Sequence, residues 1–150
     1  TTRNPDRADA LRQVGVDHVL VDDGNIADQA RRTIPDGVDA ALELVGTPTL
    51  PDTLRATRVH GVVCFTGMLS NQWTVRDFYP IEYLPRGVRL TAYGGDATDL
   101  PTQVLQDFLD AVAAGDAIVP IHRTYRLDDI ATAHADMEAG RATGKLVVLP

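Results

Sequence analysis

The sequence predicts an α/β fold in which a mostly parallel sheet carries helices on both of its faces. Three observations lead to this prediction. Helical and strand-like segments alternate along the 150 residues, the strand-like runs are short and apolar, and turn-forming residues separate the segments. Parallel strands need such intervening helices as crossovers, and these crossovers are right-handed.

The first third of the chain predicts two helices and one strand. The first helix starts at the N-cap residue Asn4, has Pro5 in its first position and ends at Gly15. The apolar run at 18–21 predicts a short strand. Residues 25–34 place apolar side chains on one helical face and predict the second helix.

The middle of the chain predicts three strands, one helix and an irregular segment. The length of segment 38–45 and its position between turns favour a buried strand, although Ala-Ala-Leu-Glu-Leu has helical propensity. A helix is expected over 49–59, and strands over 61–65 and 88–93. Residues 70–87 contain tryptophan and two prolines and predict an irregular excursion.

The last third predicts two further helices and two further strands. The clearest helix covers 99–114. Its apolar stripe consists of Val104, Leu105, Phe108, Leu109 and Val112. Residues 119–127 are expected to be extended, residues 128–139 to form a helix after an aspartate N-cap, and residues 145–149 to form the last strand.

The composition argues against several functions. The net charge is −7 and the sequence pI is about 4.9, so the chain offers no basic patch for nucleic acid or an anionic membrane. Its apolar runs are too short to span a bilayer, and its first residues contain no apolar signal region. Cys64 is the only cysteine, which is typical of a protein kept in the reducing cytoplasm.

The residue pattern contains no set of metal ligands and no nucleophile. The four histidines are scattered, none in a zinc-binding pattern, and His134 lies on an apolar helix stripe that favours a packed side chain. Cys64 lies within an apolar stretch and is interpreted as part of the core. Ser70, the only serine, has no nucleophile-elbow motif around it. We therefore assign no metal ligand and no catalytic residue.

The chain lacks G-x-G-x-x-G, the glycine loop that opens a Rossmann dinucleotide-binding domain. In that domain the ribose-reading residue lies about 20 residues after the glycines, at the end of the second strand. This chain begins with the polar loop and helix that follow that strand, and its first residue is not Met. We therefore expect an incomplete Rossmann-like doubly wound parallel sheet, without its first strand, glycine loop and most of its second strand, plus a C-terminal strand–helix–strand.

Thr1, Thr2 and Arg3 occupy the expected ribose-reading position. Arginine binds a phosphate through two hydrogen bonds and a neighbouring hydroxyl can add another, so these residues favour the 2′-phosphate of NADP. A solvated arginine beside a helix explains the same residues, and both interpretations stay open. Gly46 and Gly67 each follow a strand, where ligands bind in doubly wound sheets, although ordinary turns also place glycine there.

Five segments carry a family resemblance. They are residues 1–19, 38–46, 61–69, 86–93 and, as the strongest match, 125–148, which ends in Gly-Arg-Ala-Thr-Gly-Lys-Leu-Val-Val. In their order and spacing they resemble the medium-chain dehydrogenase/reductase superfamily, in its quinone-oxidoreductase-like, zinc-binding-dehydrogenase-type branch.

This resemblance implies hydride transfer from NADPH to a small quinone-like or enone-like substrate. It implies six cofactor-binding residues: Thr2, Arg3, Gly46, Gly67, Met68 and Lys145. Among them Arg3, supported by Thr2, would bind the 2′-phosphate, and Lys145 would lie near the cofactor phosphates. The family's catalytic domain and any zinc ligands would lie upstream of this sequence, so no catalytic residue is carried over.

The resemblance also implies two domains and a dimer. Residues 1–116 would form a partial dinucleotide-binding domain, and residues 117–150 would belong partly to the substrate-binding domain. The strand at 88–93 would pair with its own copy in a homodimer. Because two strands are missing, we expect the strand at 18–21 to join the strand at 38–45 directly or to pair with another copy.

Three functions follow from these observations. The leading one is the C-terminal, cofactor-binding part of an NADPH-dependent oxidoreductase, inactive by itself because the glycine loop supplies the pyrophosphate contacts. An enoyl reductase of the same superfamily is the alternative among enzymes. A non-catalytic α/β binding or regulatory module is the alternative outside them, because it explains the missing glycines without truncation.

Overall fold

The computed structural model describes residues 1–150, which form two units that divide after Gly94. The first unit covers Thr1–Gly94 and the second covers Gly95–Pro150. None of the helices in either unit has both the length and the apolar character that crossing a bilayer requires.

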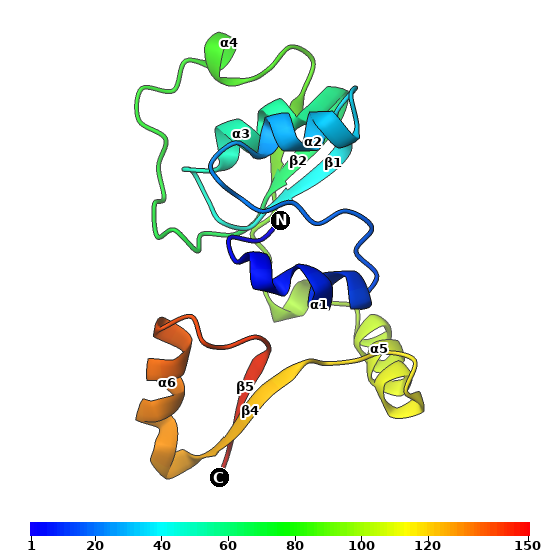
Figure 1. The fold of residues 1–150 in the computed structure, drawn as a ribbon, viewed down its shortest axis with the longest axis vertical. Helices are drawn as coiled ribbons and strands as arrows, with labels where there is room; N and C mark the ends of the chain where they lie inside the picture. The colour runs from blue at the N-terminus through cyan, green and yellow to red at the C-terminus, as the bar shows by residue number, and fades with distance from the viewer. The chain divides into compact units, whose positions relative to one another are not determined.

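The first unit is built on a parallel three-stranded sheet (Figure 1). Its strands, in the order β1-β2-β3, are β1 (Val38–Glu43), β2 (Thr57–Phe65) and β3 (Arg89–Ala92). Val63 in the middle strand pairs with Ala41 of β1 and Leu90 of β3, and its side chain is fully buried. The three predicted strands and their parallel arrangement are confirmed.

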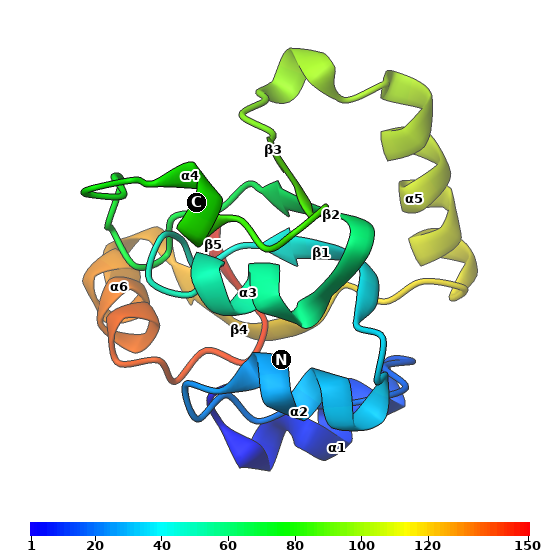
Figure 2. The ribbon, with the colours of Figure 1, turned by 90° about the horizontal axis from the view of Figure 1, so that it is seen from above.

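Two helices, α2 (Ile26–Thr33) and α3 (Leu50–Ala56), lie side by side in the first unit (Figures 1 and 2). α3 packs on the sheet, where Leu50 and Leu54 form one core cluster with Val63 and Val88. This apolar contact is the main reason that α3 covers the sheet, since burial of such side chains drives packing.

α2 packs against α3 through small side chains. Ala27, Ala30 and Ala56 form a second buried cluster, and Leu20 from the preceding loop packs against it. Small side chains let the two helices approach closely, so the loop before α2 is held near the carboxyl edge of the sheet.

The N-terminal segment forms η1 (Pro5–Arg7) and α1 (Ala8–Gln13). The side chain of Asn4 accepts a hydrogen bond from the Asp6 N–H at 2.9 Å, which confirms Asn4 as the N-cap. Gly15 follows with φ of +93°, the left-handed conformation expected of a residue that ends a helix.

The strand predicted at 18–21 does not form, and its predicted pairing with the strand at 38–45 is wrong. Instead, Val21 makes an isolated parallel bridge with Thr2. Thr2 donates a backbone hydrogen bond to the Leu20 carbonyl at 3.0 Å and accepts one from Asp22 at 2.7 Å. The segment is held there because Leu20 packs on the alanine cluster of α2 and α3 and because Gln29 donates to the Val21 carbonyl at 2.8 Å.

β2 begins at Thr57 rather than at the predicted residue 61, so α3 ends at Ala56. Thr57 and Val59 are β-branched and favour a strand. The Thr57 hydroxyl also donates to the Thr53 carbonyl at 2.9 Å, which satisfies a carbonyl at the end of the helix. The excursion after β2 is irregular, as predicted, except for one turn of helix, α4 (Pro80–Tyr83).

The second unit contains the predicted parallel strand–helix–strand. β4 (Ile121–Arg126) and β5 (Lys145–Leu149) pair in parallel, and α6 (Ile130–Glu138) connects them. The remaining elements are η2 (Ala97–Asp99), α5 (Thr102–Ala114) and η3 (Leu127–Asp129). The apolar stripe predicted on α5 is present, but none of its residues is buried.

Asp136 on α6 connects three parts of the second unit. Its Oδ2 accepts a hydrogen bond from the Tyr125 hydroxyl of β4 at 2.6 Å, and its Oδ1 accepts two from Arg141 at 2.9 and 2.7 Å. The bond from Tyr125, followed by that from Arg141, lowers the pKa of the Asp136 carboxyl. The same bond is the main cause that raises the pKa of Tyr125.

Candidate functional site

The loops that follow β1 and β2 meet at the carboxyl edge of the sheet. The backbone N–H groups of Thr66 and Gly67 donate to the Glu43 carbonyl at 2.9 and 3.0 Å, and that of Ser70 donates to the Val45 carbonyl at 2.8 Å. These bonds bring together the two strand exits from which Gly46, Gly67 and Met68 were predicted to contact a cofactor.

Gly46 and Gly67 are both required by this loop contact. A Cβ on Gly67 would lie 2.2 Å from the Leu44 carbonyl oxygen, far inside normal contact distance. Gly46 has φ of +125°, which residues with a Cβ rarely adopt, and its Cβ would lie 2.6 Å from Ser70 Oγ. Loop packing therefore explains both glycines, and their contact with a cofactor stays a prediction.

A buried carboxylate, Glu43, shapes the loop after β1. Only 3% of Glu43 is exposed. Its Oε1 accepts hydrogen bonds from the N–H groups of Val45 and Gly46 at 2.8 and 3.0 Å and from the Thr49 hydroxyl at 2.8 Å. Its Oε2 accepts from the Thr53 hydroxyl at 2.5 Å. Glu43 thus joins the end of β1, the glycine turn and the first turns of α3.

Sequence reasoning missed Glu43. The available signal was a single carboxylate inside the apolar run Ala-Ala-Leu-Glu-Leu-Val-Gly, with Thr49 and Thr53 among the residues shortly after it. A charge in a buried strand needs hydrogen-bond partners, and the threonine hydroxyls supply part of them. The helix and strand propensities of this run do not by themselves reveal that role.

Tyr83 packs against the core cluster that contains Leu50 and Leu54, and the charge of Glu43 affects its pKa. Burial is the main cause that raises the pKa of the Tyr83 hydroxyl, and the negative charge of Glu43 adds to it. The hydroxyl oxygen is buried and has no hydrogen-bond partner in the structure.

An open cavity of about 560 Å³ adjoins this edge of the sheet. Its lining includes Thr1, Leu20, Asp22, residues of β1 and Val45. In doubly wound sheets the crevice at the carboxyl ends of the strands is where ligands bind. The cavity is therefore the candidate entrance for a cofactor.

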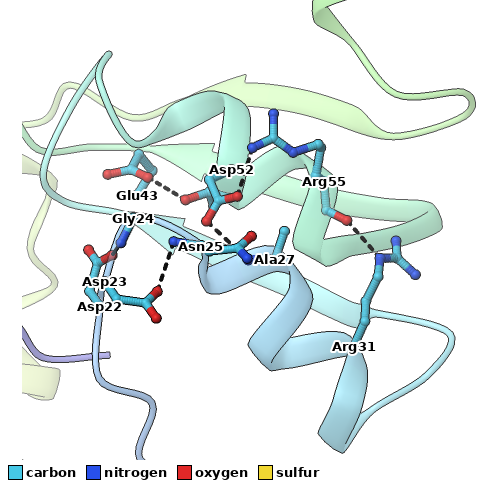
Figure 3. Close-up of polar contacts among 10 residues, drawn as sticks. Asp22, Asp23, Gly24, Asn25, Ala27, Arg31, Glu43, Asp52 and Arg55 are labelled. Carbon is cyan, nitrogen blue, oxygen red and sulfur yellow. Dashed lines mark hydrogen bonds and ion pairs between the residues drawn. The ribbon is translucent and has the colours of Figure 1, made fainter.

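The loop before α2 is fixed beside this cavity by short-range hydrogen bonds (Figure 3). The Asp22 carboxylate accepts from the Gly24 N–H at 2.9 Å, and the Asp23 carboxylate accepts from the Asn25 N–H at 3.1 Å. Asp52 on α3 accepts from the Ala27 N–H in the first turn of α2 at 3.0 Å. A carboxylate at a helix N-terminus is favourable, so Asp52 stabilises the position of α2.

The predicted cofactor residues Thr2, Arg3 and Lys145 differ in their contacts and in their exposure. Thr2 is paired with Val21, and its hydroxyl is bonded to the backbone of Asn4. Arg3 is exposed, makes no hydrogen bond or ion pair, and does not line the cavity. Lys145 lies in the second unit, exposed at the start of β5. The cofactor roles of all three stay predictions.

The sequence matches a protein-family model described as zinc-binding dehydrogenase over residues 14–148. This chain belongs to the zinc-binding dehydrogenase family. The predicted resemblance to this family is confirmed, and the quinone-oxidoreductase-like branch of the medium-chain dehydrogenases/reductases stays a prediction. No curated protein matches the chain.

Solved structures share the fold of this family member. A quinone oxidoreductase from Pseudomonas syringae is 22% identical over 99% of this chain, with a TM-score of 0.79. A mycobacterial protein in complex with NADPH is 24% identical over 100% of the chain, with a TM-score of 0.78. The CurK enoyl reductase is 19% identical over 98% of the chain, with a TM-score of 0.70. The chain covers 48%, 48% and 45% of their respective lengths.

The family description implies zinc, but the residues of this chain do not fit a zinc site. No three His, Cys, Asp or Glu side chains among residues 1–150 lie close enough together to hold a metal ion. A nicotinamide cofactor fits part of the chain better, because the loops after β1 and β2 meet beside an open cavity at the carboxyl edge.

Proposed function

We propose that this chain is the cofactor-binding part of an NADPH-dependent oxidoreductase that reduces a small quinone-like or enone-like substrate. The observation that carries the proposal is the meeting of the β1 and β2 exit loops beside an open cavity, in a member of the zinc-binding dehydrogenase family. The bound nicotinamide supplies the hydride chemistry, and the protein binds and orients it.

The proposal assigns a role in cofactor binding to the two loops, to Glu43 and to Lys145. The loops that carry Gly46, Gly67 and Met68 line the cofactor groove, and Glu43 holds the first of them in shape through its two backbone hydrogen bonds. Because Glu43 acts through the loop, it is a positioning residue. Lys145 binds a cofactor phosphate.

Arg3 is proposed to select NADP over NAD. It directly follows Thr2, which the bridge to Val21 holds in place, and its guanidinium is exposed and free of protein partners. A free guanidinium can bind a phosphate through two hydrogen bonds. The solved structure with NADPH shares this fold, which supports a dinucleotide with a 2′-phosphate.

The assembly and domain proposals follow from the same family. All four residues of β3 are exposed, and the strand forms one outer edge of the sheet, which supports pairing with a second β3 in a homodimer. Residues 1–116 would form the dinucleotide-binding part, and residues 117–150 would contribute to the substrate-binding domain. A cytoplasmic location is proposed from the single cysteine.

The experiment is an assay of the whole protein with NADPH or NADH and with quinone and enone acceptors. We expect NADPH oxidation that depends on the acceptor. Preference for a thioester-linked enoyl acceptor would favour the enoyl reductase alternative. No oxidation with any acceptor, together with no NADPH binding by calorimetry, would contradict the proposal and favour the non-catalytic module. The 150-residue chain alone is expected to bind NADPH weakly or not at all, because it lacks the glycine loop.

A further inference from the structure

The excursion between β2 and α4, residues 66–79, forms a long loop that exposes large apolar side chains (Figure 1). Leu69 is 82% exposed, Trp73 is 67% exposed and Tyr79 is 54% exposed. Trp73 is the only tryptophan of the chain. Indole and phenol rings are enriched at binding surfaces, because they offer a large apolar area and lose little side-chain entropy when they are covered. We therefore searched this loop for a contact that a ligand could complete.

The start of the excursion is attached to the loop that follows β1. The carbonyl of Gln72, which precedes Trp73, accepts a hydrogen bond from the Thr47 hydroxyl at 3.0 Å. The Ser70 N–H donates to the Val45 carbonyl at 2.8 Å, and the Ser70 hydroxyl accepts from the Gln72 N–H at 3.3 Å. These bonds place Trp73 next to the exit loop of β1.

The indole N–H of Trp73 already has an acceptor within the excursion. It donates to Asn71 Oδ1 at 3.0 Å. Asn71 has φ of 56°, a left-handed conformation that asparagine tolerates, and its N–H donates to the Met68 carbonyl at 2.9 Å. Because its N–H is used inside the loop, the exposed part of Trp73 offers a ligand an apolar ring surface instead of a hydrogen-bond donor. Such a surface suits a second flat ring, packed offset or edge on.

The end of the excursion is held on the core through α4. Tyr83 and Leu84 pack against the core cluster that contains Leu54. Phe78 meets the ring of Tyr83 edge to face, with the ring centroids 5.0 Å apart. Since the protein holds both ends of the excursion, a ligand that stacks on Trp73 has less of the loop to order.

Trp73 belongs to the rim of the cofactor cavity and not to its lining. Leu69, four residues before it, lines the cavity, as do Val45 and Pro48 on the two sides of Thr47. Trp73 does not line it. A ring stacked on Trp73 would therefore leave the cofactor groove free. An acceptor has to approach a nicotinamide bound in that groove from its rim.

We propose that the exposed indole of Trp73 stacks on the acceptor substrate and selects a flat-ring quinone over a small acyclic enone. The inference rests on the proposed function and narrows it to one of its two substrate classes. A quinone ring is flat and electron-poor and an indole is electron-rich, so stacking buries apolar area on both and is electrostatically favourable. An acyclic enone has too little flat surface to gain from this contact. Trp73 thus determines specificity and takes no part in the hydride transfer.

The test is steady-state kinetics of the whole protein with NADPH and either naphthoquinone or methyl vinyl ketone. Trp73→Ala should lower kcat/KM for naphthoquinone about tenfold, through a higher KM, and should leave kcat/KM for methyl vinyl ketone within about twofold. Trp73→Phe keeps a ring and should retain most of the activity with naphthoquinone. Ile81→Ala is the matched control, because Ile81 is 81% exposed on α4, and it should change neither value.

A binding measurement without NADPH separates this inference from the proposed function. Naphthoquinone stacked on Trp73 should lower the fluorescence intensity of the protein without shortening its lifetime, and Trp73→Phe should lose that quenching. If this quenching occurs but the protein oxidises no NADPH with any acceptor, the proposed function fails and the stacking stands.

Three outcomes would overturn the stacking while the proposed function stands. One is NADPH oxidation in which Trp73→Ala affects naphthoquinone and methyl vinyl ketone equally. Another is the absence of any Trp73-dependent quenching at saturating naphthoquinone. The third is a shift of Trp73→Ala to a smaller assembly in sedimentation, which would mean that the indole contacts a second copy of the protein.

Discussion

The two units of this chain each use a carboxylate to hold secondary structure together, but with different partners. Glu43 in the first unit is buried and accepts only from backbone N–H and threonine hydroxyl groups. Asp136 in the second unit accepts from a tyrosine and from Arg141, whose side chain is 57% exposed. The comparison teaches that a buried carboxylate must find all its hydrogen-bond donors within the protein, whereas a carboxylate near the surface can pair with a partly solvated arginine.

Removal of the Glu43 carboxylate should give the largest loss of unfolding free energy among the variants considered. Glu43→Ala leaves two N–H groups and the Thr53 hydroxyl without their acceptor, and leaves the Thr49 hydroxyl with only the Gly46 carbonyl, so we expect a loss of about 3 kcal/mol in unfolding free energy. Glu43→Gln keeps one acceptor oxygen and should lose about 1 kcal/mol. Urea denaturation measures both. The control is Glu82→Gln, an exposed position on α4, and an equal small effect for all three variants would contradict the role of Glu43.

Gly67 tests the other side of the same loop contact. Gly67→Ala places a Cβ against the Leu44 carbonyl, so the two loops must separate, and we expect a cost of about 2 kcal/mol in unfolding free energy. Gly94→Ala is the matched control, because its Cβ would meet nothing within 4 Å. If the two substitutions have the same small effect, the loops are not tightly packed at this edge.

Asp136 should give the smallest effect, visible in its dependence on pH. Its pKa is lowered in the folded chain, so its stabilising contribution is present above the pKa of the unfolded carboxyl. That contribution is lost as pH falls through the lowered pKa. The protection factors of the β4 and β5 amides, after correction for the pH dependence of intrinsic exchange, should therefore fall in acid, and Asp136→Asn should flatten this response. A response that the variant leaves unchanged would mean that other groups hold the second unit.

The sequence predicted the sheet better than the site. Strands at 38–45, 61–65 and 88–93 were recognisable because each is an apolar run bounded by turns. Residues 18–21 looked the same but formed a single bridge, because a strand depends on its neighbours and its neighbour here is only Thr2. Partners far along the chain decide such outcomes, and local pattern does not contain them.

The site shows the same limit. Gly46 and Gly67 were identified from their positions after strands, but their requirement comes from contact between two loops that are distant in sequence. Glu43 was missed because its role depends on its burial and on a hydrogen bond from Thr53 in the helix that follows β1. Arg3 was identified from its position alone, and the structure leaves it exposed and free.

The most direct test of the proposed cofactor is the NADPH preference of the whole protein carrying Arg3→Ala. The control is Arg12→Ala, an exposed arginine of α1 that pairs with Asp9. Loss of charge-assisted hydrogen bonds to the 2′-phosphate should lower the ratio of kcat/KM for NADPH over NADH by about tenfold or more in the Arg3 variant. The control should leave the ratio unchanged. An Arg3 variant that keeps the original ratio would contradict the assignment of Arg3 to the 2′-phosphate.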